Sequence, residues 1–278
     1  MEKKIVIAGL GLIGGSIAKA LRLYTDYRIY AYDINEDTLL DACSCGVIDG
    51  KASPSDIACA DIIYLSLYPE DSVGFVREHA GNIKESCIVT DACGIKTEIC
   101  EELEKLRKEH GFIFVGGHPM AGKEKSGFSA SDPSMFLGAS YIITPLEAPE
   151  DAVNTIEDLA LKMGFGRVVK TNPQAHDEMI AFTSQVPHVL ACAYVMSPCC
   201  ENHRGFSAGS YRDVSRVADI NEVLWSRLFL DNKEPLLGEI DTLIENIQKI
   251  RNAVAEEEET NLKNLLKQAG DIKRGDLK

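Results

Sequence analysis

The strongest constraint on the fold of this chain is a series of short apolar runs that alternate with helical patterns as far as about Lys170. Continuous apolar strands of this length, separated by helices, indicate βαβ units and a mostly parallel sheet that helices cover on both faces. The sequence therefore predicts an α/β domain. Its strands are expected at Lys4–Ala8, Arg28–Tyr32, Ile62–Leu67, Ile88–Thr90, Phe112–Val115, Tyr141–Thr144 and Arg167–Val169.

The pattern changes after the segment KTNPQAHDE, because no strand candidate follows it and long helical patterns take over. Apolar residues then recur at steps of three and four and form one helix face: Leu236, Leu237, Ile240, Leu243, Ile244, Ile247 and Ile250. We expect a boundary near Asn172, with the α/β domain over residues 1–171 and an all-helical domain over residues 172–278. A face this continuous needs a partner surface, and a second copy is the simplest one, so we expect a homodimer.

The composition argues against several classes of partner and site. The formal net charge is −14 at pH 7, whereas nucleic-acid binding requires clustered lysines and arginines. No stretch approaches the ~20 apolar residues of a membrane span, and the start, MEKKIVIAG, lacks the apolar segment of a secretion signal. The nine cysteines lack the spacing of a zinc site, so we expect no metal and a reduced, cytoplasmic environment.

The segment IVIAGLGLIGGSIAKAL carries a G-x-G-x-x-G pattern between an expected strand and an expected helix, formed by Gly9, Gly11 and Gly14. The first glycine permits a tight turn, the second lets backbone amides approach a pyrophosphate, and the third lets helix and strand pack closely. The helix start, around Leu12 and Ile13, adds partial positive charge. These residues predict a Rossmann-type domain that binds a dinucleotide.

The next expected strand, RIYAYD, ends at Asp33, where a carboxylate can accept hydrogen bonds from the adenosine ribose. Because that carboxylate repels a 2′-phosphate, we expect NAD rather than NADP. The alternative, a glycine-rich turn followed by an unrelated exposed aspartate, does not explain why strand, helix and acid fall in these places.

A further cofactor contact is expected in the segment YLSLYPED, which lies at the carboxyl end of a central strand. Open α/β sheets bind ligands at that edge. The residues expected to contact the cofactor there are Leu67 and Pro69. The proline either shapes the loop beneath the nicotinamide or simply ends the strand.

The loop GGHPMAGKEKSG follows the expected strand Phe112–Val115, so His118 lies at the carboxyl edge of the sheet, beside the expected cofactor. Pro119 restricts the backbone of this histidine, and an imidazole can accept a proton at neutral pH. An isolated loop histidine is usually a plain surface residue. Its place in a dinucleotide-binding fold favours a catalytic base.

Three segments together resemble the prephenate/arogenate dehydrogenases of tyrosine biosynthesis: GLGLIGGS, GGHPMAGKEKSG and YRDVSRVADINEVLWSRLFLDNK. The resemblance covers nearly the whole chain, and the last two segments are far more specific than the glycine pattern. Enzymes of this family oxidise the C4 alcohol of a cyclohexadiene by hydride transfer to NAD(P)+. They release the ring carboxylate as CO2 and yield a phenol.

The resemblance assigns roles to individual residues. It implies that His118 withdraws the proton of the C4 hydroxyl, and that Arg216 binds a substrate carboxylate through its planar guanidinium. Aromatisation drives the loss of CO2, so no metal is required. The other substrate contacts that the resemblance implies are Ser184, His188, Arg212, Glu124 and Trp225.

Several of these assignments leave an alternative open. Ser184 and His188 are four residues apart and share one helix face, which Pro187 should kink, but His188 also fits a core histidine. Trp225 either reaches towards the neighbouring subunit's site or packs in a core. Two positions depart from the family pattern: Gly94 stands where many members have serine, and Lys123 where threonine is frequent.

We therefore expect NAD-dependent oxidative decarboxylation of prephenate to 4-hydroxyphenylpyruvate, without an added regulatory or chorismate mutase domain. One alternative is arogenate as the substrate, which would give tyrosine directly. A dehydrogenase of the 3-hydroxy-acid kind would favour a catalytic lysine in the helical domain, and we find no convincing candidate. A non-catalytic NAD-responsive regulator would leave His118 and Arg216 unexplained.

Overall fold

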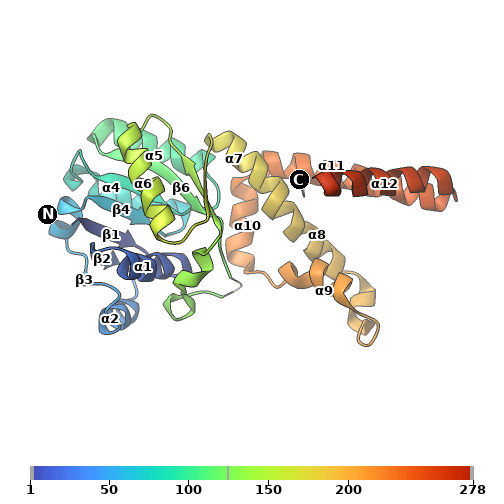
Figure 1. Ribbon diagram of the computed structural model, residues 1–278, viewed down its shortest axis with the longest axis horizontal. Coiled ribbons are helices and arrows are strands. Elements are labelled where there is room, and N and C mark those ends of the chain that lie inside the picture. Colours follow the sequence, from blue (N-terminus) through green and yellow to red (C-terminus); the bar gives the residue numbers. More distant parts are fainter. Residues whose placement is uncertain (1–2, 124, 276–278) are drawn as a thin grey trace. The chain divides into compact units, whose positions relative to one another are not determined.

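The computed structural model describes residues 3–123 and 125–275, and the chain divides into two compact units (Figure 1). The first unit comprises Met1–Ile180 and Asp219–Asp231, and the second comprises Ala181–Ala218 and Asn232–Lys278. The segment Asp219–Asp231 thus packs with the α/β unit although it lies far along the sequence. The domain boundary expected near Asn172 stays a prediction.

The first unit is built on an eight-stranded sheet in the order β3-β2-β1-β4-β5-β6-β7-β8. Neighbouring strands are parallel except β6 and β7, which are antiparallel. The mostly parallel α/β sheet is confirmed, and only the two-residue edge strand β3 has no counterpart among the expected runs. The strands are β1 (Lys4–Ala8), β2 (Arg28–Tyr32), β3 (Gly50–Lys51), β4 (Ile62–Leu65), β5 (Ile88–Asp91), β6 (Ile113–Pro119), β7 (Ser140–Thr144) and β8 (Arg167–Lys170).

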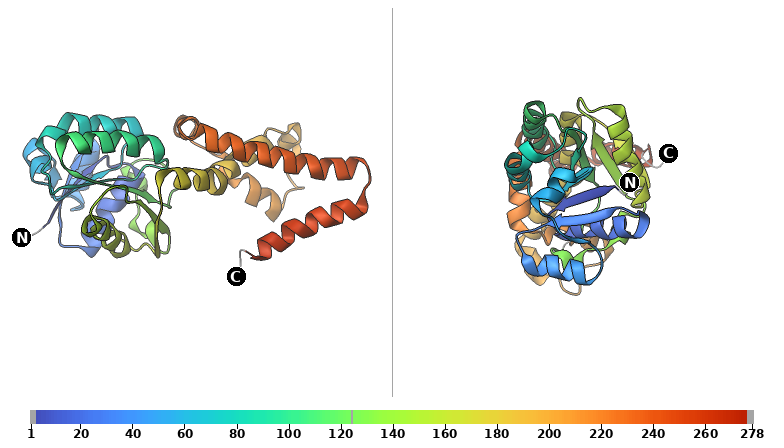
Figure 2. Two further views of the ribbon diagram at one scale, coloured as in Figure 1. Left: turned by 90° about the horizontal axis from the view of Figure 1, so that it is seen from above. Right: turned by 90° about the vertical axis from the view of Figure 1, so that its left-hand side faces the viewer.

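Helices cover both faces of this sheet (Figure 2). Alternate residues of β1 point to opposite faces, so that Ile5 and Ile7 pack in one core with α1 and α6, while Val6 and Ala8 pack in a second core with α3, α4 and α5. Both faces are apolar, which is why the strands read as continuous runs. The helices are α1 (Leu12–Tyr24), α2 (Glu36–Ser44), α3 (Pro54–Cys59), α4 (Pro69–His79), α5 (Thr97–His110), α6 (Glu150–Lys162), α7 (Pro173–Ile180) and α10 (Glu222–Asp231).

The second unit is helical and contains no strand within its described residues, as the sequence predicts. Its main helices are α8 (Val186–Val195), α9 (Gly209–Ser215), α11 (Lys233–Ala255) and α12 (Glu259–Gly275). Large apolar side chains of α11 remain exposed, with relative exposures of 57% for Ile244, 50% for Ile247 and 58% for Val254. Across residues 3–123 and 125–275, no helix is both long and apolar enough to cross a membrane.

Candidate active site

The glycine turn joins β1 to α1 at the point where the strand order reverses, since β2 lies on one side of β1 and β4 on the other. Open α/β sheets bind ligands at such a point. Gly9 has a φ of +91°, and a Cβ there would lie 2.6 Å from the Ser66 carbonyl oxygen. A Cβ at Gly14 would lie 1.9 Å from the Gly9 carbonyl oxygen. Close approach of the protein's own backbone therefore requires both glycines.

Gly11 is not required in this way. It is the N-cap of α1 with an ordinary φ of −68°, and a Cβ there would meet no protein atom within 4 Å. The side chains of Leu12 and Ile13 in the first turn are half-buried, and no acidic residue lies in that turn. The start of α1 thus offers its amides to an anion, and the turn fits the pyrophosphate of a dinucleotide.

Backbone amides hold the carboxylate of Asp33 in place. Its Oδ2 accepts a hydrogen bond from Leu10 N at 2.7 Å, and its Oδ1 accepts one from Asn35 N at 2.8 Å. Carboxylate oxygens have further acceptor capacity, so Asp33 can also accept from a ribose hydroxyl. The first turn of α2 adds Glu36 and Asp37, which makes this end of the site acidic.

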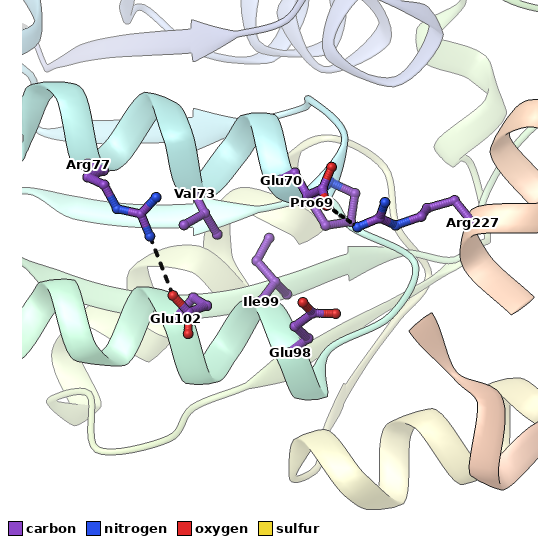
Figure 3. A pocket seen from close by; sticks show the side chains of 8 residues that line it. All are labelled: Pro69, Glu70, Val73, Arg77, Glu98, Ile99, Glu102 and Arg227. Atoms are coloured by element: carbon purple, nitrogen blue, oxygen red, sulfur yellow. Dashed lines mark hydrogen bonds and ion pairs between the residues drawn. The ribbon is translucent and has the colours of Figure 1, made fainter. Parts of the chain in front are cut away.

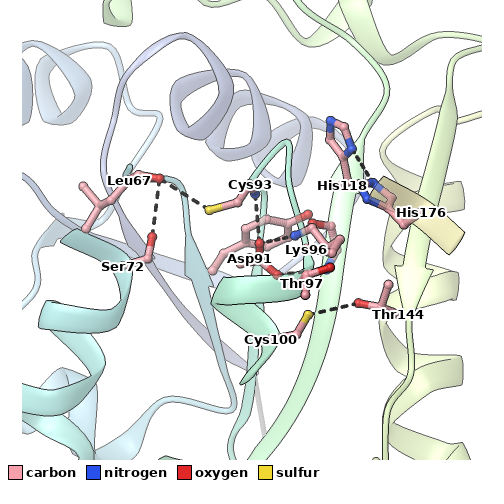
Figure 4. Close-up of polar contacts among 12 residues, drawn as sticks. Leu67, Ser72, Asp91, Cys93, Lys96, Thr97, Cys100, His118, Thr144 and His176 are labelled. Carbon is pink, nitrogen blue, oxygen red and sulfur yellow. Dashed lines mark hydrogen bonds and ion pairs between the residues drawn. The ribbon is translucent and has the colours of Figure 1, made fainter. Parts of the chain in front are cut away.

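The segment after β4 lies against the glycine turn. A Cβ at Gly9 would be 2.8 Å from Cδ2 of Leu67, and the Leu67 carbonyl oxygen accepts from Ser72 Oγ at 3.4 Å (Figure 4). The strand ends at Leu65, and Pro69 is the first residue of α4. Proline is well suited to that position because its missing N–H would have no partner there.

His118, near the carboxyl end of β6, takes part in a chain of hydrogen bonds (Figure 4). Its Nδ1 lies 2.9 Å from Nε2 of His176, and Nδ1 of His176 lies 2.6 Å from Oδ1 of Asp177. The Asp177 carboxylate also accepts hydrogen bonds from the backbone amides of Lys96 and Thr97, each at 2.8 Å. His118 is thereby linked to the N-terminus of α5 and to the middle of α7.

The ionised Asp177 fixes the direction of these hydrogen bonds. A carboxylate only accepts, so His176 donates from Nδ1 and accepts at Nε2 from Nδ1 of His118. The pattern therefore assigns the lone pair of His118 to Nε2, the form that a general base needs.

Electrostatics favour the uncharged form of both rings. Burial lowers the pKa of His118 well below 6.5, and His176 and Lys96 lower it further. Burial also lowers the pKa of His176, against the opposing effect of Asp177. Burial by itself would raise the pKa of Asp177, but hydrogen bonds from His176 and the α5 amides outweigh it and lower that pKa.

The two glycines before His118 are required by their surroundings. A Cβ at Gly116 would lie 2.0 Å from Oγ1 of Thr144, and one at Gly117 would lie 2.2 Å from the Tyr141 hydroxyl oxygen. Overpacking of this kind displaces neighbours in a close-packed core. These two glycines, which the sequence predicted to lie in a loop, are part of β6 and allow β7 to approach it next to His118.

The structure shows the surroundings of Gly94 and Lys123, the two positions that depart from the family pattern. A Cβ at Gly94 would be 3.9 Å from Nε2 of His118 and 3.6 Å from Cδ2 of Leu228, so this position faces the proposed base and offers it no hydroxyl. His176 holds the ring from the other side instead. Lys123 forms an ion pair with Asp132 at 2.8 Å.

Four of the expected substrate contacts belong to the second unit. His188 Nδ1 lies 2.8 Å from the Ser184 backbone carbonyl oxygen, and the expected role of both side chains as substrate contacts stays a prediction. Helix α8, which carries His188, packs against α9, which carries Arg212, and against the 3-10 turn that begins at Arg216. Both arginine side chains are exposed.

Residues 181–185 form a π-helical turn directly before α8. Pro187 follows at the start of α8. Proline lacks an N–H and crowds the preceding turn of a helix, and π-turns are frequent at functional sites. The helix is irregular at the position where the sequence predicts a kink.

The remaining two expected contacts lie elsewhere. Trp225 is half-buried in α10 of the first unit, with its ring centroid 5.6 Å from that of Phe229. Its reach towards a neighbouring subunit stays a prediction. Glu124 lies outside the described residues.

A surface pocket of about 210 Å³ lies along α4, α5 and α10 (Figure 3). Pro69 lines it, but neither His118 nor the glycine turn does. Four of its charged side chains form two ion pairs, Arg227 with Glu70 and Arg77 with Glu102. The pocket therefore lacks the proposed base, and we do not assign the substrate to it.

Family models cover nearly all of the chain. Residues 17–170 match the model described as prephenate dehydrogenase, nucleotide-binding domain, and residues 172–268 match the model described as prephenate dehydrogenase, dimerization domain. The chain belongs to the prephenate dehydrogenase family.

Individual relatives agree with this assignment. A prephenate dehydrogenase of Bacillus subtilis is 33% identical over 286 residues, which span 99% of this chain and 76% of the relative. A prephenate dehydrogenase of A. aeolicus, solved with hydroxyphenyl propionate and NAD+, has a TM-score of 0.84 at 28% identity, covering 100% of this chain and 99% of that one. Arogenate dehydrogenase of Synechocystis has a TM-score of 0.84 at 24% identity, covering 98% and 99%, which shows a shared fold.

Four polar residues of this family member were not anticipated as part of the site: Asp91, Lys96, His176 and Asp177. Their segments, TDACGIKTE and KTNPQAHDE, stand out in the sequence only as a strand end and a change of pattern. The sequence feature that could have pointed to them is the pair of adjacent residues His176 and Asp177, which follows shortly after the Asn-Pro start of a helix. Nothing in their spacing shows that they meet a histidine on β6.

Proposed function

We propose that this chain catalyses NAD-dependent oxidative decarboxylation of prephenate to 4-hydroxyphenylpyruvate, a step of tyrosine biosynthesis. The observation that carries the proposal is the hydrogen-bonded chain from His118 through His176 to Asp177, which lies at the same carboxyl edge of the sheet as the glycine turn. The A. aeolicus relative, solved with hydroxyphenyl propionate and NAD+, supports both the aromatic ligand class and the cofactor.

Each of the proposed residues has a separate role in the reaction. The glycine turn and Asp33 hold NAD+, which when bound accepts the hydride from C4 of the substrate. Nε2 of His118 takes the proton of the C4 hydroxyl, and the positive charge that forms on the ring is stabilised through His176 by Asp177. The ring carboxylate then leaves as CO2, the electrons of the broken C–C bond complete the aromatic ring, and the resulting phenolate oxygen takes the proton back from His118. Arg216, with Arg212, His188 and Ser184, binds the substrate's carboxylates in this proposal.

A direct assay tests the proposal. NADH formation is followed with prephenate and with arogenate side by side, at equal enzyme concentration. Turnover with prephenate is expected. A strong preference for arogenate would overturn the assignment of the substrate, and NAD binding without turnover of either compound would favour a non-catalytic regulator.

We predict that the charge of Asp33 sets the preference for NAD. Asp33→Asn keeps an acceptor for Leu10 N but removes the charge that repels a 2′-phosphate. The ratio of kcat/KM with NAD to that with NADP should fall by about 10-fold, which corresponds to roughly 1.4 kcal/mol. Asp41→Asn, an exposed acid on α2, is the matched control. A wild-type preference for NADP would contradict the assignment.

We propose that the second unit forms a homodimer through the exposed apolar face of α11. The family model that matches this part of the chain is named for dimerization, and Leu237, Ile244 and Ile247 are 44–57% exposed in one chain. Light scattering should give about twice the chain mass of 30.4 kDa.

The double variant Ile244→Glu/Ile247→Glu should dissociate this dimer, since unpaired charges would be buried at the contact. Thr242→Glu/Lys249→Glu adds charge on the opposite side of α11 and serves as the control. A wild-type monomer at micromolar concentration with full activity would refute the dimer.

The nine free cysteines fit the cytoplasmic location, which stays a prediction.

A further inference from the structure

Two fully buried charges lie behind His118. Asp91 is the last residue of β5, and Lys96 is the N-cap of α5. Their side chains form an ion pair, and each has 0% exposure (Figure 4). Removing two charges from water costs several kcal/mol for each ion, so a buried pair contributes little net stability compared with apolar residues of similar size. Stability alone does not account for this pair.

The other hydrogen bonds of the pair converge on the residue before His118. Oδ1 of Asp91 accepts from Gly117 N at 3.0 Å, and Nζ of Lys96 donates to the Gly117 carbonyl oxygen at 2.6 Å. Backbone pairing between β5 and β6 extends only to Thr90 and Val115. The two side chains therefore continue the attachment of β6 to β5 beyond the last backbone pair, up to the proposed base.

Lys96 also reaches His118 by a second route. Its backbone N–H donates to Oδ1 of Asp177 at 2.8 Å, and the same oxygen accepts from Nδ1 of His176 at 2.6 Å. His176 in turn accepts from Nδ1 of His118. The side chain of Lys96 thus holds the backbone that carries His118, while its main-chain N–H, which another residue could also supply, helps to hold the carboxylate at the end of the His118–His176 chain.

We propose that Lys96, held by Asp91, is a positioning residue for the reaction, which fixes the place and the orientation of His118. The proposal rests on the proposed role of His118 as the base. Lys96 touches neither substrate nor cofactor in this scheme, and acts entirely through Gly117, Asp177 and the electric field at the two rings.

The charges near the two rings act in different directions. The charged groups that face the rings from β5, α5 and α7 are Asp91, Lys96 and Asp177. Lys96 lowers the pKa of both His118 and His176, whereas Asp91 and Asp177 raise the pKa of His176 only. From α10, the apolar Leu228 faces Gly94, while Arg227 is bound by Glu70 and Asp231. Loss of the Lys96 charge should therefore let His118 take up a proton at a higher pH.

The double variant Asp91→Asn/Lys96→Met tests this, because it removes both charges without leaving one buried and unpaired. We expect kcat for prephenate to fall about 10- to 100-fold, the scale for a slightly misplaced catalytic group, with KM nearly unchanged. The acid limb of the pH profile of kcat/KM, which reports the base of the free enzyme, should move to higher pH.

The control is Glu102→Gln/Lys105→Met, which removes an exposed ion pair of α5 and should change neither constant nor the pH profile. A purely structural role of Lys96 predicts that activity per folded enzyme and the acid limb both stay at wild-type values in the Asp91/Lys96 variant. That result would overturn the proposal.

A measurement on the wild-type enzyme holds even if the double variant does not fold. The ¹⁵N NMR signals of the imidazoles, assigned by comparison with His118→Asn, should show a His118 that is protonated at Nδ1 and stays uncharged below pH 6.5. Protonation of the His118 ring at Nε2 instead of Nδ1 would contradict the orientation that the hydrogen bonds through Asp177 and His176 are proposed to fix, and would overturn the proposal. This readout does not depend on turnover, so it is separate from a failure of the wild type to oxidise prephenate.

Discussion

Replacing His118 with asparagine is expected to lower kcat for prephenate by about 10²–10⁴, with little change in KM. Asparagine has a similar shape and can still donate a hydrogen bond to His176, but it cannot accept the proton of the C4 hydroxyl. The interaction that is lost grows stronger as the hydride leaves, so its loss falls on the transition state more than on the bound substrate. Steady-state NADH formation gives both constants.

His110→Asn is the matched control, because His110 is exposed at the end of α5 and should leave both constants unchanged. A His118→Asn enzyme with wild-type kcat would show that another group takes the proton. A large rise in KM at constant kcat would show that His118 mainly binds the ground state.

The wild-type pH profile should reflect the lowered pKa of His118. A base whose pKa lies below 6.5 stays uncharged at neutral pH, so kcat/KM should stay level through pH 6.5 and fall only at lower pH. The contribution of His118 to folding stability changes with pH in the same direction. The unfolded chain binds the proton at about pH 6.5 and the folded chain only at lower pH, so folding stability from this group is lost as pH falls below 6.5.

Local patterns were sufficient to predict the sheet and to place His118 near its carboxyl edge. The runs that became β1 and β4 are buried on both faces, and this burial is what a continuous apolar run reports. The same rule placed His118 near the carboxyl edge, although the strand was expected to end at Val115 and β6 in fact continues to Pro119, because Gly116–Pro119 pair with β7. The direction of β7 was not predictable, because an apolar run does not specify whether its neighbour is parallel.

The polar contacts around His118 could not be predicted for a different reason. His176 meets His118 across 58 residues of sequence, and Lys96 meets Asp177 across 81. Such contacts depend on how α7 packs beside the start of α5, which no local periodicity encodes. Similarly, Leu228 in α10 lies beside Gly94, although its segment reads simply as one more helix of the C-terminal half.

Arg216→Ala is expected to raise KM for prephenate by an amount equivalent to roughly 2–4 kcal/mol, while kcat changes little. Arg216 begins a 3-10 turn directly after α9, and in the proposed function its guanidinium pairs with a carboxylate that is already present in the ground state. Removing uniform binding of this kind raises KM without slowing the chemical step. Arg216→Lys should restore only part of the loss, because an ammonium group cannot form the two parallel hydrogen bonds of a guanidinium.

Arg274→Ala, which removes an exposed arginine paired with Asp271, controls for a general loss of positive charge. An unchanged KM in Arg216→Ala would refute the carboxylate contact, and a fall in kcat alone would show that the arginine acts in the transition state.

The variant that combines Arg216→Ala with His118→Asn tests whether the two residues act independently of each other. If one residue binds a carboxylate and the other moves a proton, their losses in kcat/KM should multiply, since uncoupled sites contribute additively to the free energy. A combined loss well below the product would mean that the arginine also helps to hold the substrate hydroxyl against His118.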